Sequence, residues 1–100
     1  MEVVITQQDN ETVARLIGRL DTPASADVAR AMEPLLEAAS GVVVLDCTEM
    51  TYISSSGLRI FLTVRKAAAE KGGKVIVRHI SNEIRGVFMM TGFLNLFEIQ

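Results

Sequence analysis

The chain has 100 residues, of which 49% are apolar, 22% charged and 5% aromatic, and its formal net charge is −2. This length suits one small domain, and the apolar content excludes an intrinsically disordered chain. The acidic balance argues against nucleic-acid binding, and no apolar run is long enough to insert into a membrane. Because Cys47 is the only cysteine and no secretory leader opens the sequence, we expect one cytoplasmic domain over residues 1–100.

Hydrophobic periodicity predicts four strands and three helices. The strand segments are rich in β-branched residues or form short apolar runs, whereas the helical segments repeat apolar residues every three or four positions. Prolines, glycines and hydroxyl side chains mark the ends of these segments. In chain order we expect strands 3–6 and 12–17, a helix from 22 to about 40, a strand 42–45, a helix 56–71, a strand 74–79 and a helix 82–91.

Three stretches leave the local structure open. Pro34 either kinks the first helix or ends it early, because proline removes a backbone hydrogen bond. Residues 47–52 connect the central strand to the second helix as a polar bridge, and residues 93–99 form either a last strand or a final helical turn. Met89 and Met90, together with Phe88 and Phe93, lie at helical spacing, which favours core packing, although an adaptable apolar surface is the alternative.

The order of these elements predicts an α/β fold built on a single small mixed sheet of four to five strands. Strand–helix–strand crossovers give parallel pairs with right-handed connections, and the opening hairpin adds an antiparallel pair. We expect the helices to pack mainly on one face of the sheet. Because this packing leaves no long apolar stripe exposed, a monomer is expected.

Three consecutive serines, Ser54, Ser55 and Ser56, stand where a predicted strand passes into the second helix, and Gly57 follows them. The simplest interpretation is that Ser54 or Ser55 caps the helix, since serine is a favoured N-cap residue. One cap leaves hydroxyl groups to spare at a positively polarised helix end, which accommodates an anion such as a phosphate attached to serine. Gly57 leaves room for a close approach of the chain or of a partner.

The sequence gives little support to a catalytic, nucleotide or metal site. A nucleophilic serine needs a base and a third group that orients the base, but the only histidine, His79, is expected at a strand end on the surface. Cys47 has no basic cluster beside it and is interpreted as a buried or loop thiol. No phosphate-binding glycine loop and no metal-ligand spacing occur, so we expect neither an enzyme nor a bound cofactor or metal.

The segments 45–46 and 50–59 together resemble the signature of STAS domains, the module of bacterial anti-sigma factor antagonists. Three further stretches, 18–21, 72–73 and 90–93, match the same pattern in the same order. The resemblance therefore extends over essentially the whole chain.

The resemblance implies a protein-interaction switch that phosphorylation controls. Unphosphorylated antagonists of this family bind an anti-sigma factor that is also a serine kinase of the histidine-kinase-like ATPase fold. Phosphorylation ends this binding, and a metal-dependent serine phosphatase restores it. The family's site reads Asp-Ser-Ser/Thr-Gly, which places the modified serine at Ser55, with Ser56 and Ser54 less favoured. Ser54 stands where the family has aspartate, while Asp21 and Asp46 match its other acidic positions.

The match also implies which residues bind a partner. Ser55 and Arg59 are four residues apart, so we expect a phosphate on Ser55 to be held by the helix-end amides and to reach Arg59. The expected binding residues are Asp21, Thr22, Ser54, Ser55, Ser56, Gly57, Leu58 and Arg59.

Two other functions are left open. One alternative is an assembly subunit of a membrane-transport or sensory complex in which Ser55 is only a cap, and the least favoured is an enzyme with a serine nucleophile.

Overall fold

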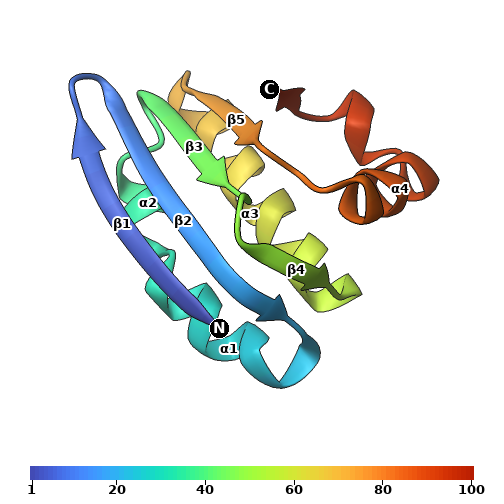
Figure 1. Ribbon diagram of the computed structural model, residues 1–100. Coiled ribbons are helices and arrows are strands. Elements are labelled where there is room, and N and C mark those ends of the chain that lie inside the picture. Colours follow the sequence, from blue (N-terminus) through green and yellow to red (C-terminus); the bar gives the residue numbers. More distant parts are fainter.

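The computed structural model describes all 100 residues and shows one six-stranded sheet with helices along one of its faces (Figure 1). The strand order is β1-β2-β3-β5-β6, and β4 pairs with β2 beyond the end of β3. β1 is antiparallel to β2, whereas the other pairs are parallel. The elements are β1 (Glu2–Gln8), β2 (Glu11–Leu20), α1 (Thr22–Ala31), α2 (Glu33–Glu37), β3 (Val42–Asp46), β4 (Met50–Ile53), α3 (Ser55–Lys71), β5 (Lys74–Arg78), α4 (Asn82–Thr91), the 3₁₀ turn η1 (Phe93–Asn95) and β6 (Glu98–Ile99).

The predicted mixed sheet with helices mainly on one face is confirmed, but its strands differ from the prediction. There are six strands in place of four to five. The two-residue β6 is the closing strand that residues 93–99 left open, and β4 is the additional strand, formed within the expected polar bridge. The predicted end of the second strand at residue 17 is wrong, since β2 continues through Gly18 to Leu20. Gly18 has a φ of 102°, and its N–H donates to the Glu49 carbonyl at 3.0 Å. At this residue β2 changes its neighbour from β3 to β4.

The segment around Pro34 forms two helices in place of one. Met32 lies between them as the C-cap of α1 and the N-cap of α2. Pro34 lies in the first turn of α2, where its missing N–H needs no partner. The Lys71 ammonium donates to the Leu36 carbonyl at 2.7 Å, which ties the end of α3 to α2. Residues 93–99 were expected to form either a strand or a helical turn, and they contain both. The helical turn is η1, and the short strand β6 follows it.

The main core lies between the sheet and the helices and contains 23 buried residues. Four phenylalanines, Phe61, Phe88, Phe93 and Phe97, pack on one another with ring centroids 5.6–6.4 Å apart. These rings come from α3, α4, η1 and the residue before β6, so their packing holds α4 and the C-terminal segment against α3.

The prediction of core packing is confirmed for Phe88 and Phe93 and is wrong for Met89 and Met90. These methionines are 66% and 89% exposed, whereas Phe88 beside them is fully buried. Successive helical residues are turned by about 100°, so three neighbours cannot share one face. Phe88 and Ile84 take the inner face of α4, which turns both methionines outward.

The opposite face of the sheet carries no helix (Figure 1). Val13, Val44 and Ile76 form one cross-strand row on this face and are buried without any covering element. Charged side chains flank the row, including the ion pair between Arg78 and Glu11 at 3.9 Å. The aliphatic parts of such side chains shield the apolar row while their charges stay in water.

Candidate functional site

The site forms where the carboxyl ends of β2 and β4 lie side by side. Leu20 pairs with Ile53 across these strands, and the Ser54 N–H donates to the Leu20 carbonyl at 2.9 Å. Each strand passes directly into a helix, β2 into α1 and β4 into α3. Two helix N-termini therefore lie next to each other at one end of the sheet.

Both helix ends are capped by the residues that the sequence places there. Asp21 accepts a hydrogen bond from the Ala24 N–H at 3.1 Å, and the Ser54 hydroxyl accepts one from the Gly57 N–H at 3.2 Å. Ser54 is only 8% exposed, so its hydroxyl is a structural cap. Serine and aspartate cap helices about equally well, so Ser54 supplies here the cap that an aspartate would supply.

The capping role of Ser54 leads to a stability prediction. Ser54→Ala should lower the free energy of unfolding by about 1 kcal/mol, because it removes the hydrogen bond at the first turn of α3. Ser54→Asp should keep most of the stability, since a carboxylate caps the same N–H group. Urea unfolding followed by circular dichroism measures both.

The matched control is Ser55→Ala, which changes an exposed serine that makes no side-chain hydrogen bond and should alter stability by less than about 0.5 kcal/mol. Equal unfolding midpoints for Ser54→Ala and Ser55→Ala would show that the cap contributes nothing.

The eight residues expected to bind a partner divide into a surface set and a supporting set. Ser54, Gly57 and Leu58 are buried and hold the helix in position, so they lie beneath the surface. The other five expose part or all of their side chains. These are Asp21, Thr22, Ser55, Ser56 and Arg59. Of the three serines, Ser55 is exposed, Ser56 is half-buried and Ser54 is enclosed.

Arg59 lies on α3 one turn after Ser55, and both side chains are exposed. It lines a groove of about 310 Å³ between α1 and α3, together with Ser25, Ser56 and Thr63. None of the ion pairs in the structure involves Arg59. Its guanidinium is therefore the one charge in a groove otherwise lined by hydroxyl and apolar groups.

Arg19 and Tyr52 form a second feature of this surface, which the sequence reasoning missed. They are register partners on β2 and β4, and the Arg19 guanidinium lies 4.3 Å from the centre of the Tyr52 ring. Arg19 also approaches the Asp21 carboxylate at 4.0 Å. Tyr52 is 41% exposed, so an aromatic ring and a cation border the strand ends that lead into both helices.

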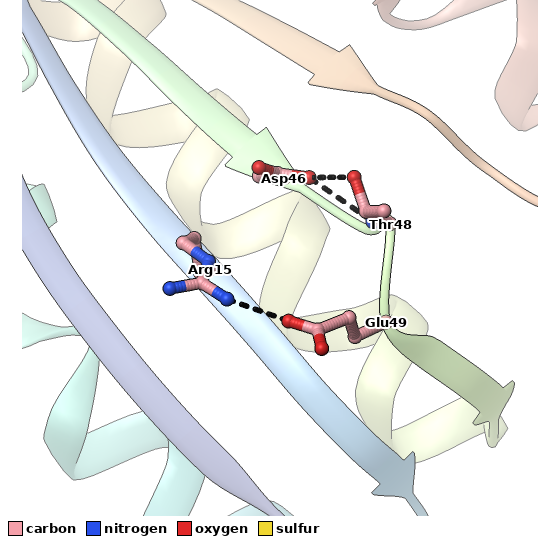
Figure 2. A network of polar contacts seen from close by, with 4 residues as sticks. All are labelled: Arg15, Asp46, Thr48 and Glu49. Carbon is pink, nitrogen blue, oxygen red and sulfur yellow. Dashed lines mark hydrogen bonds and ion pairs between the residues drawn. The ribbon is translucent and has the colours of Figure 1, made fainter.

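A polar network fixes the turn between β3 and β4 (Figure 2). Asp46 accepts hydrogen bonds from the N–H and the hydroxyl of Thr48 at 3.0 and 2.6 Å, and Arg15 donates to Glu49 at 2.6 Å. Partial burial raises the pKa of Asp46, but the Thr48 hydrogen bonds and the charges of His79 and Arg15 outweigh it and bring the pKa below its ordinary 3.8. The ionised carboxylate thus holds the turn that positions β4 and the start of α3.

The remaining candidate residues lie apart from this surface. Cys47 is fully buried, as expected, and burial raises the pKa of its thiol to about 12, which keeps it protonated and unreactive. His79 is exposed just beyond β5, where its backbone N–H donates to the Gln100 carbonyl. No group of three or more histidine, cysteine or acidic side chains gathers to hold a metal ion. None of the helices has the length and apolar character that a membrane span requires.

Solved structures share this architecture. The unphosphorylated form of the anti-sigma factor antagonist SpoIIAA aligns with a TM-score of 0.75 at 18% identity, covering 99% of this chain and 87% of that chain. A candidate anti-sigma factor antagonist from Thermotoga maritima aligns with a TM-score of 0.88 at 13% identity, covering 97% and 84%. At these identities the likeness establishes the fold, which is that of SpoIIAA.

The sequence comparisons then give the family. Residues 2–100 match the family model of the STAS domain, and the chain belongs to that family. BtrV of Bordetella bronchiseptica, named as a candidate anti-sigma factor antagonist, is 27% identical over 99 residues, which are 99% of this chain and 85% of that protein. The resemblance seen in the sequence motifs is confirmed.

Proposed function

We propose that this chain is an anti-sigma factor antagonist that phosphorylation of Ser55 controls. The observation that carries the proposal is the contrast among the three serines. Ser54 is used as a cap, Ser56 is half-buried in a groove, and Ser55 presents a free hydroxyl at the first position of α3. The relatives named as anti-sigma factor antagonists support the partner class, and SpoIIAA has been solved in phosphorylated and unphosphorylated forms.

Phosphorylation would act on this surface mainly through charge. A phosphate adds about −1.5 to −2 charges at neutral pH and meets the unpaired N–H groups of the first turn of α3. The Arg59 guanidinium, one turn along the same face and without an ion-pair partner, is the cation within the reach expected for a helical pair. The fold itself needs no rearrangement to accept the group.

The same charge would prevent docking. A partner surface complementary to a neutral hydroxyl would have to face a dianion and the neighbouring Asp21 carboxylate. A 100-fold loss of affinity corresponds to about 2.7 kcal/mol, which lies within the cost of an unpaired or repelled charge in an interface. The proposed partners are an anti-sigma serine kinase of the histidine-kinase-like ATPase fold and a metal-dependent serine phosphatase that reverses the modification.

Incubation with ATP and candidate kinases of this class tests the assignment of the acceptor. We expect the intact mass to increase by one phosphate and peptide mapping to place it on Ser55. Ser55→Ala should abolish the mass increase, whereas Ser56→Ala, the matched control on the next residue, should retain it. A phosphate on Ser56 with Ser55 unmodified would reject the assignment.

A further inference from the structure

The outer edge of β1 is the longest free strand edge of the molecule. β1 pairs with β2 on one side only, over all seven residues and without a register shift. No backbone hydrogen bond outside the β1–β2 pairing involves residues 2–8. Every second N–H and C=O group along this strand therefore points away from the sheet without a protein partner.

Natural sheets protect such edges with lysines, prolines, bulges or very short strands. The β6 edge follows this pattern, because it has two residues and Glu98 is engaged by Lys74 at 2.8 Å. β1 has none of these features. Its sequence EVVITQQ contains no lysine, proline or glycine, and Glu2 is its only charge.

An apolar groove of about 250 Å³ lies along this edge, between β1 and α1. Its lining is apolar except for one carboxylate, so an added strand would find a place for side chains beside its backbone hydrogen bonds. On the α1 side the alanines leave room for a neighbouring chain to come close. The lining residues are Met1, Val3, Ala24, Asp27, Val28 and Ala31.

We infer that β1 pairs antiparallel with β1 of a second copy of this chain, about a two-fold axis at Val4. This register places Val4 opposite Val4, Val3 opposite Ile5 and Glu2 opposite Thr6. Apolar residues meet apolar residues of the same sheet face, and the single charge of each strand meets a neutral hydroxyl residue. The strand is thus complementary to itself, as a two-fold interface requires.

A second copy also fits better than an unrelated strand, because pairing joins the two sheets into one and leaves free only short edges, those of the four-residue β4 and the two-residue β6. β4 and the start of α3 lie on the other side of β2 from β1. Both Ser55 sites therefore stay open in the dimer, and this inference does not depend on the proposed function. The monomer expected from the sequence rested on the packing of the helix faces. That argument does not consider strand edges, because helix periodicity gives no information about them.

Single cysteines in β1 test the pairing and its register. Val4→Cys places two thiols opposite each other across the axis, with Cβ atoms about 4.5–5.5 Å apart, near the separation of a disulfide. Thr6→Cys, on the same face of the same strand, places its two thiols about four residues or roughly 14 Å apart along the strands. We expect mild oxidation to link Val4→Cys into dimers and to leave Thr6→Cys unlinked. Cys47 does not interfere, because its thiol is buried.

Sedimentation measurements over a wide concentration range test whether the wild-type chain itself dimerises. The wild-type chain should approach twice its monomer mass at high concentration. Val4→Lys should remain a monomer because two lysines would meet on the axis, whereas Thr6→Lys would face Glu2 and should still associate. A wild-type chain that stays monomeric throughout, or equal cross-linking of both cysteine variants, would overturn the inference.

Discussion

Ser55→Asp is expected to weaken binding to the anti-sigma partner by about 100-fold or more, whereas Ser55→Ala should bind like the wild-type chain. The hydroxyl makes no hydrogen bond within the chain, so its removal costs the fold little. In the proposed interface, a permanent carboxylate at the same position would be an unpaired charge against a partner surface complementary to a neutral group. Calorimetric titration of each variant with the partner measures the difference.

A matched control separates charge at the site from charge in general. Ser40→Asp makes the same change at an exposed serine before β3, at the opposite end of the sheet, and should leave the affinity unchanged. Equal binding by the wild-type, Ser55→Ala and Ser55→Asp chains would instead indicate a constitutive assembly subunit, in which this end of the molecule carries no switch.

The helix caps of the candidate site were largely predictable because their signals are local. A cap needs only a hydroxyl or carboxylate a few residues before the amide that it binds, and both Asp21 and Ser54 satisfy this spacing. Sequence alone did not decide whether Ser54 or Ser55 would be the cap. The structure decides it, because β4 pairs with β2 up to Ile53 and turns Ser54 inward.

β4 itself was missed because its stability comes from distant parts of the chain. Met50 and Ile53 are buried while Thr51 and Tyr52 are exposed, so the segment lacks the alternation that marks a half-buried strand. Its pairing partner is the end of β2, about thirty residues earlier in the sequence. The contact between Arg19 and Tyr52 depends on this pairing and could not be foreseen without it.

Gly57→Ala is expected to destabilise the chain and to disturb the site, although alanine is the better helix former by about 1 kcal/mol. A Cβ atom at Gly57 would lie 2.6 Å from the Leu20 Cγ atom and 2.9 Å from the Ile53 Cγ1 atom, both in buried side chains. Overpacking of this kind costs about 1–3 kcal/mol, and here it would push α3 away from the two strand ends that position Ser54. Thermal unfolding should show a Tm lower by several degrees, together with weaker partner binding.

Gly86→Ala makes the same chemical change but is expected to raise the stability of the chain. Gly86 lies in α4, and a Cβ atom there would meet no atom within 4 Å, so helix propensity alone should raise stability by about 0.5–1 kcal/mol. The pair therefore separates close packing from helix propensity. Stabilisation of both variants would contradict this explanation. It would mean that position 57 tolerates a side chain beside Leu20, and that packing against the sheet does not hold the start of α3.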